Sequence, residues 1–150
     1  MAPETSLREV TKETVREITK LDVGPDQLGL VAPNSVSIAE AHFEPKAWFR
    51  AIYSGDEPAG FTMVWRDPPE GVFYIWRFMV DARFQGRGVG RRALELLIDE
   101  ARADGAAEVT LSVVPGPNSA LGFYESLGFE PTGVVHGGET ELRLALDDSR

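Results

Sequence analysis

The sequence of 150 residues contains no cysteine. Disulfide bridges, thiolate nucleophiles and cysteine-based metal sites are therefore excluded. The chain also shows no internal repeat, no low-complexity tract and no break in composition that would mark a second domain. We expect residues 1–150 to form one domain, which suits a chain of this length.

Long apolar runs are also missing. No stretch approaches the roughly 20 apolar residues that a membrane-spanning helix needs. Residues 1–5 lack the basic and apolar regions of a secretory signal. These absences favour a soluble cytoplasmic protein that does not bind a membrane. Hydrophobic residues nevertheless make up 43% of the chain, so a core is expected rather than disorder.

Positive charge is scarce. Fifteen lysines and arginines stand against 24 aspartates and glutamates, giving a formal net charge of −9. Nucleic acid is therefore an unsuitable partner, because phosphate binding needs a basic surface. A cationic substrate would be attracted to such a protein. An acidic surface that only maintains solubility explains the same balance.

Hydrophobic spacing predicts the order strand–helix–helix–strand–strand–strand–helix–strand–helix–strand–strand. Strands are expected at 6–10, 48–53, 60–66, 72–80, 109–114, 129–135 and 139–146, and helices at 11–24, 34–44, 88–103 and 118–127. Thr11 is the expected N-cap of the first helix, and Asn34 or Ser35 that of the second. The near-continuous apolar strand 109–114 is expected to be covered on both faces. The order predicts an α/β (α+β) fold, a mixed sheet with helices on both faces.

A glycine-rich turn at 80–92 joins an apolar strand to an amphipathic helix. Its distinctive residues are Gly86, Gly88, Gly90, Arg87, Arg91 and Arg92. A helix N-terminus offers unpaired N–H groups and a positive dipole end, and glycines let a phosphate approach the backbone. This local excess of positive charge in an acidic protein favours a pyrophosphate-like anion over a plain tight turn.

Two other kinds of phosphate-binding turn fit this segment less well. A P-loop would end in Gly-Lys-Ser or Gly-Lys-Thr, which is absent. The segment Gly88-Val89-Gly90-Arg91-Arg92-Ala93 matches the dinucleotide-binding pattern G-x-G-x-x-A. In that fold the glycines follow the first strand, and an acidic residue ends the next strand roughly 20 positions on. In this sequence much of the chain precedes the glycines, and the nearest acidic residue, Glu108, begins its strand instead of ending it. The dinucleotide-binding interpretation is therefore rejected.

The segment Gln85-Gly86-Arg87-Gly88-Val89-Gly90 resembles the Q/R-x-x-G-x-G/A motif of the GNAT acetyltransferase superfamily. Residues 118–129 resemble the Asn/Ala/Tyr helix of the same family. In its usual pattern, N-x-x-A-x-x-x-Y, Ala120 and Tyr124 stand in register, whereas Asn118 is one place too close. The resemblance covers nearly the whole chain. It implies a mostly antiparallel central sheet of six to seven strands.

The resemblance also implies the cofactor, acetyl-CoA (CoA), and no metal. The turn would hold the pyrophosphate, the strand end before it would pair with pantetheine, and Tyr124 would serve the leaving thiolate as catalytic acid. The implied cofactor-binding residues are Phe78, Met79, Val80, Gln85, Gly86, Arg87, Gly88, Val89, Gly90, Arg91, Asn118 and Phe123. An amine would attack the thioester directly. Its proton acceptor stays open among Glu40, Asp22, Glu57 and His42.

Carboxylates beside aromatic rings suit an ammonium group. Asp22, Glu40, Trp65 and Trp76 are the expected substrate-binding residues. Residues 31–40 and 74–83 resemble the spermine/spermidine (diamine) acetyltransferase subgroup, so a polyamine is the lead substrate. Another small amine, such as an antibiotic or an amino-acid derivative, a protein amine, and a non-catalytic acyl-CoA sensor remain alternatives. The family resemblance also implies a homodimer.

Overall fold

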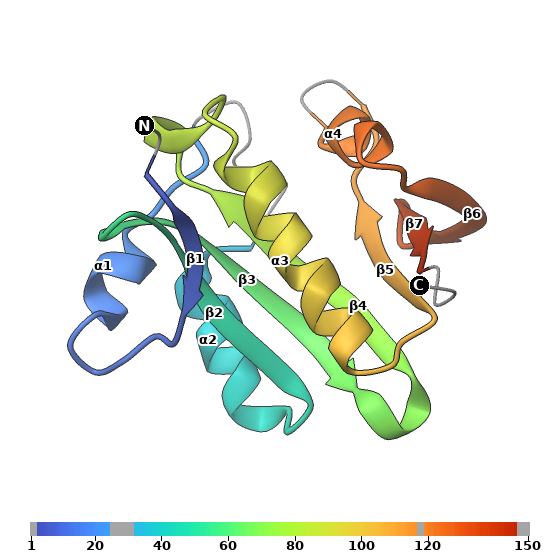
Figure 1. Ribbon diagram of the computed structural model, residues 1–150, viewed down its shortest axis with the longest axis horizontal. Helices are drawn as coiled ribbons and strands as arrows, with labels where there is room; N and C mark the ends of the chain where they lie inside the picture. The colour runs from blue at the N-terminus through green and yellow to red at the C-terminus, as the bar shows by residue number, and fades with distance from the viewer. Residues whose placement is uncertain (1–2, 25–31, 117–118, 147–150) are drawn as a thin grey trace.

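The computed structural model describes residues 3–24, 32–116 and 119–146. Within them a seven-stranded sheet has the order β1-β2-β3-β4-β5-β7-β6 (Figure 1). The strands are β1 (Thr5–Arg8), β2 (Ala47–Ser54), β3 (Glu57–Asp67), β4 (Val72–Val80), β5 (Glu108–Val113), β6 (Glu130–His136) and β7 (Glu139–Ala145). All neighbours are antiparallel except β4 and β5, which are parallel. The mixed, mostly antiparallel sheet is therefore confirmed.

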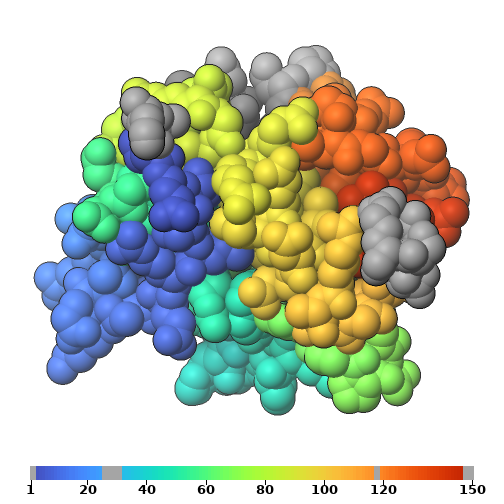
Figure 2. All heavy atoms as spheres, in the orientation of Figure 1, coloured from blue at the N-terminus to red at the C-terminus, as the bar shows by residue number. Residues whose placement is uncertain are grey.

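Helices cover both faces of this sheet, as expected. The helices are α1 (Val15–Thr19), α2 (Asn34–Phe43), α3 (Val89–Ala103) and α4 (Leu121–Ser126), with short 3-10 turns η2 (Pro68–Glu70) and η3 (Ala82–Phe84). On one face, Ile18 of α1 packs with Phe61 and Met63 of β3. On the other, α3 lies between the N-terminal strand and the C-terminal elements (Figure 2). The predicted element order is confirmed.

The periodicity of α3 explains its position. Its apolar residues recur at helical spacing and form one stripe. Val89, Ala93, Leu94, Leu97 and Ala101 are buried. The stripe packs on the sheet together with the second half of the chain, including the buried β5 and β7 residues of the largest core cluster. The helix predicted at 88–103 therefore differs from the observed one only at its N-cap, Gly88.

The central feature of the sheet is the short contact between its two parallel strands. β4 pairs with β5 only at Tyr74 with Thr110 and Ile75 with Leu111. Beyond these pairs the strands diverge (Figure 1). A register shift between β3 and β4 falls at the same level, since Met63 pairs with Arg77 and Val64 with Ile75. A bulge bends its strand locally, so β4 turns away from β5 and keeps β3 as its partner.

The expected helix N-caps were wrong. α1 begins at Val15 after a turn in which the Thr11 N–H donates to the Thr14 hydroxyl, 2.9 Å away. α2 begins at Asn34 itself, with Pro33 as N-cap. The Asn34 amide is buried and donates to the Ile18 carbonyl oxygen (2.9 Å), which ties α2 to α1. The side chain that was expected to cap its own helix is used instead for tertiary packing.

The expectation that strand 109–114 is covered on both faces was also wrong. Burial alternates along β5: Val109, Leu111 and Val113 are buried, whereas Thr110 and Ser112 are partly exposed. The helices α1 and α2 pack mainly against β2 and β3. Within the described part of the chain, no helix covers the same face of β5 and β7. The last helix, predicted at 118–127, is also shorter, and it begins after Ser119, whose hydroxyl accepts the Leu121 N–H (3.2 Å).

The close approach of β3 and β4 at Gly60 provides a test of the packing. A Cβ at Gly60 would collide with the Met79 carbonyl oxygen. We expect Gly60→Ala to lower the free energy of unfolding by about 1–3 kcal/mol, because overpacking displaces backbone. Gly122→Ala in α4 is the control, since its Cβ would meet nothing within 4 Å. Urea denaturation measures both, and equal stability of the two variants would contradict the packing argument.

Candidate active site

The divergence of β4 from β5 opens a cavity of about 980 Å³. Residues 76–80 of β4 form one wall, with no β5 partner along their free edge. The other walls come from the end of β5, the glycine-rich turn and α4. The cavity brings together most of the residues expected to bind the cofactor: Phe78, Met79, Val80, Gln85, Gly86, Gly88, Gly90, Arg91, Phe123 and the expected acid Tyr124. Arg87 and Val89 do not line it, and Asn118 lies outside the described residues.

The glycine-rich turn forms one end of this cavity. Gly86 and Gly88 have φ angles of 78° and 83°, a left-handed conformation that side chains strongly disfavour. Gly88 is the N-cap of the 15-residue helix α3. A Cβ at Gly90 would lie 3.4 Å from Val80 and 3.5 Å from Phe123. The N-terminus of α3, with the positive end of its dipole, therefore lies at the cavity, where glycines leave the backbone N–H groups accessible.

Asp81 anchors the start of this turn. Its buried carboxylate accepts the backbone N–H groups of Asp22 and Arg83 (both 3.0 Å) and the Arg83 Nε (2.9 Å). Burial alone would raise the pKa of Asp81. These hydrogen bonds and the Arg83 charge together outweigh burial and hold the pKa below its ordinary value. The ionised carboxylate thus connects the segment after α1 to the turn.

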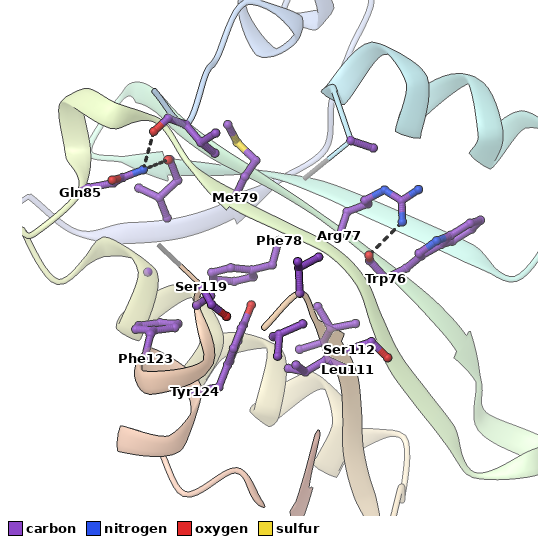
Figure 3. A pocket seen from close by; sticks show the side chains of 18 of the residues that line it. Trp76, Arg77, Phe78, Met79, Gln85, Leu111, Ser112, Ser119, Phe123 and Tyr124 are labelled. Carbon is purple, nitrogen blue, oxygen red and sulfur yellow. Dashed lines mark hydrogen bonds between the residues drawn. The ribbon is translucent and has the colours of Figure 1, made fainter. Parts of the chain in front are cut away.

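Gln85 strengthens this connection. Its side-chain amide donates to the carbonyl oxygens of Val80 (2.8 Å) and Val23 (3.1 Å), as the dashed lines in Figure 3 show. Gln85 therefore holds the end of β4 against the segment after α1. In this structure its side chain shapes the turn, while the turn's backbone forms the cavity.

Tyr124 projects from α4 into the cavity. Its ring packs edge-on against Phe123, Phe129 and Phe78, at centroid distances of 5.2, 5.6 and 6.4 Å. The hydroxyl points toward β4 (Figure 3). Burial raises the pKa of the Tyr124 phenol above its ordinary value. The hydroxyl therefore remains protonated at neutral pH and can donate a hydrogen bond.

A second cavity, of about 530 Å³, adjoins the first. It is polar, and its residues come from β4, β5 and the β6–β7 hairpin: Tyr74, Trp76, Arg77, Ser112, His136, Glu139 and Glu141. It lies along the part of the sheet that α1 and α2 leave uncovered. Four of its residues also line the first cavity: Trp76, Arg77, Ser112 and Glu139. The two cavities therefore meet where β4 parts from β5.

Arg77 lies at this junction. Its guanidinium pairs with Glu40 of α2 (3.1 Å), donates to the Trp76 carbonyl oxygen (3.1 Å) and lies 5.0 Å from the Trp76 ring centroid. Its Nε is buried and has no hydrogen-bond partner among the residues that the structure describes. The β4 bulge is held by the Thr62 hydroxyl, which donates to the Arg77 carbonyl oxygen (2.8 Å). A fixed cation and an indole ring are thus held at the meeting point of the cavities.

The residues expected to bind substrate do not form one group. Trp76 lines both cavities, and Trp65 packs edge-on against it with centroids 6.3 Å apart. Glu40 contacts the site through Arg77. Asp22 instead accepts the Gly24 N–H (3.1 Å), near the glycine-rich turn. Asp22, Glu40 and Trp65 do not line either cavity.

Of the proton-acceptor candidates, His42 is exposed and packs edge-on against Phe43, and Glu57 begins β3. Neither residue lines a cavity. Sequence reasoning missed the polar residues at the cavity junction, Arg77, Ser112 and Glu139. They come from three strands and share no motif. The only signal was the placement of charged residues in or beside apolar strands.

Known proteins share this architecture. The profile of the acetyltransferase (GNAT) family matches residues 12–129. Over 141 residues the chain is 27% identical to the spermine/spermidine N(1)-acetyltransferase of Bacillus subtilis (strain 168), covering 87% of this chain and 90% of that protein. Over 76 residues it is 38% identical to the N-alpha-acetyltransferase RimI of Mycobacterium tuberculosis, covering 51% and 46%.

A solved structure agrees on the fold. The PaiA N-acetyltransferase of Thermoplasma acidophilum, in complex with coenzyme A, has a TM-score of 0.73 and 12% identity, and covers 95% of this chain and 99% of that chain. This similarity shows a shared fold. Because the family profile matches residues 12–129, the chain belongs to the acetyltransferase (GNAT) family. Members of this family are acyl-CoA-dependent N-acetyltransferases. Acetyl-CoA is accordingly its cosubstrate.

Within residues 3–24, 32–116 and 119–146, no group of three or more His, Asp or Glu side chains lies close enough together to hold a metal ion. No helix in the same ranges is long and apolar enough to cross a membrane.

The Asp81 anchor predicts a pH-dependent stability. Because the folded-state pKa is depressed, the stabilisation is present above the unfolded-state pKa of about 3.9 and is lost as pH falls through the folded value. We expect Asp81→Asn to unfold more easily at pH 7, by about 1–3 kcal/mol. This difference should shrink below about pH 4. Thermal unfolding between pH 3 and 7 measures it, with the exposed Asp99→Asn as control; a pH-independent difference would contradict the anchor.

Proposed function

We propose that the protein transfers the acetyl group of acetyl-CoA to a primary amine of a small molecule, with polyamines as the lead acceptors. The observation that carries this proposal is the meeting of two cavities where β4 parts from β5. One cavity begins at an anion-binding helix terminus and contains Tyr124. The other is polar and carries carboxylates. A thioester and an amine can thus approach each other from two directions.

The larger cavity suits the cofactor. The turn from Gln85 to Arg91 would hold the pyrophosphate on backbone N–H groups at the N-terminus of α3. The free edge of residues 76–80 would pair with the pantetheine arm as an added strand does. The same backbone N–H groups would polarise the thioester carbonyl, which stabilises the oxyanion of the tetrahedral intermediate.

The chemistry needs two proton movements. The amine must lose a proton before it attacks, and the thiolate must be stabilised as the C–S bond breaks. Tyr124 meets the second need. Because its pKa is raised and a thiol has a pKa of about 8.5, a complete proton transfer leaving a free phenolate is unfavourable. We therefore assign Tyr124 as a hydrogen-bond donor and relay, which gives its proton to sulfur while it receives one from the nitrogen.

The smaller cavity supports a cationic acceptor. Arg77 is neutralised by Glu40, whereas Glu139 and Glu141 add two carboxylates to the lining. Tyr74 and Trp76 add aromatic faces, which attract ammonium groups. The overall charge of −9 would attract polycations over longer distances. The relative named for spermine and spermidine supports this class, and the relative named for N-alpha-acetylation makes other amines the second candidates.

Assembly and location are further parts of the proposal. β6 is an edge strand, and its Val134 and Val135 are exposed. An exposed apolar edge favours pairing with another chain. We propose a homodimer that works in the cytoplasm.

The pyrophosphate turn can be tested with matched glycines. Gly88 and Gly71 both have left-handed backbone, with open space where a Cβ would stand. Alanine at either position should therefore cost a similar strain, about 1–2 kcal/mol. Only Gly88→Ala should weaken CoA binding, by about tenfold or more, corresponding to 1.4 kcal/mol. Titration calorimetry measures the affinity, and equal CoA binding by both variants would contradict the assignment of the turn.

The role of Tyr124 predicts a loss of turnover. Release of free thiol from acetyl-CoA, assayed against polyamines, other small amines and a peptide, should be amine-dependent in the wild type. Tyr124→Phe should lower kcat about 10²-fold or more, because the relay hydroxyl is lost. CoA affinity should stay near wild type, since the ring remains. Binding of CoA without turnover of any amine would favour a sensor, and no CoA binding would refute the function.

A further inference from the structure

We propose that Glu139 receives the attacking ammonium group and accepts its proton. This inference rests on the proposed function and specifies its missing base. Four residues line both cavities: Trp76, Arg77, Ser112 and Glu139. An indole and a hydroxyl are not bases near neutral pH, and a guanidinium is always protonated. The carboxylate of Glu139 is therefore the one proton acceptor among these four shared residues.

The register of the strands explains why Glu139 reaches the junction. It is the first residue of β7, directly after the Gly137-Gly138 turn, and it pairs with His136 across the hairpin. The next residue, Thr140, pairs with Val113, the last residue of β5. Glu139 thus stands beside the end of β5, where Val113 also lines the cofactor cavity. The end of β5 is where the separation from β4 is widest (Figure 1).

The other nearby carboxylates already have partners. Glu141 accepts a hydrogen bond from the Thr132 hydroxyl (2.9 Å) and lies 3.6 Å from the His136 Nε2. It lines only the smaller cavity. Glu40 pairs with Arg77 and does not line either cavity. Glu139 is exposed, and no described residue forms an ion pair or hydrogen bond with its side chain. Its carboxylate is therefore available to an incoming ammonium.

The charged and titratable neighbours of Glu139 come from three strands. Arg77 and Tyr74 belong to β4, His136 to β6 and Glu141 to β7. The charge of Arg77 is compensated by Glu40, 3.1 Å away, so the carboxylates of Glu139 and Glu141 set the charge that an incoming ammonium meets. Glu139 would accept the proton at the junction and deliver a neutral amine to the thioester.

The steps balance. The ammonium gives one proton to the Glu139 carboxylate, which passes it to solvent. The neutral nitrogen forms the C–N bond to the thioester carbon, and the C–S bond then breaks. The second proton of the nitrogen reaches sulfur through the Tyr124 hydroxyl. The products are an N-acetylated amine, CoA thiol and one released proton.

The test compares Glu139→Gln with wild type, using the best amine of the panel. The variant keeps the size of the side chain and removes the base. We expect kcat/KM for the amine to fall about 10²-fold or more, while CoA affinity and thermal stability are unchanged. In the variant, kcat/KM should keep rising as the pH approaches the pKa of the amine itself, because only the fraction of amine that is already neutral can react. The loss should also shrink for less basic amines, which need less help in deprotonation. Glu139→Asp should retain part of the activity.

Glu130→Gln is the matched control, because Glu130 lies in the same hairpin and lines neither cavity. It should behave as wild type. A Glu139→Gln variant within twofold of wild type would overturn the proposal, as would an equal loss for all amines with an unchanged pH profile. A loss confined to Glu141→Gln or His136→Gln would assign the base to that pair instead. Absence of amine turnover by the wild type would refute the proposed function itself before any variant is compared.

Discussion

The structure depends on how briefly β4 and β5 pair. Two residue pairs join them, and the bulge that sets Met63 against Arg77 turns the rest of β4 away. A fully paired sheet would have satisfied every backbone group and left no room for a ligand. Here the free N–H and C=O groups of residues 76–80 face a cavity of about 980 Å³. The functional site is therefore a region of the sheet that the protein leaves unpaired.

Several interactions keep this opening in place. Asp81 and Gln85 fasten the end of β4 and the turn to the segment after α1. Thr62 holds the bulge from β3. On the other side, the Tyr124 ring packs among aromatic residues at the end of β5. Because each wall is secured to a different part of the chain, the opening is preformed and needs no large rearrangement before it can bind a cofactor.

Much of the fold followed from local patterns. β4 was predicted with its observed bounds and α3 within one residue, because strand alternation and the helical stripe are strong, local signals. The predicted helix N-caps were wrong for a different reason. Asn34 has the right side chain for an N-cap, but its amide instead bonds the Ile18 carbonyl from a distant element. A local sequence pattern cannot show that a tertiary contact will compete with the N-cap position for the same side chain.

By itself, the sequence determined the glycine-rich turn before α3 and the position of Tyr124 in the helix after β5. Both depend on glycine backbone freedom and helix spacing, which act over a few residues. Only the tertiary structure decided which residues meet where the two cavities join. Arg77, Ser112 and Glu139 meet because of a bulge, a short parallel pairing and a hairpin register. Arg77, Ser112 and Glu139 belong to separate strands that are distant in sequence, so their junction exists only once the sheet has assembled.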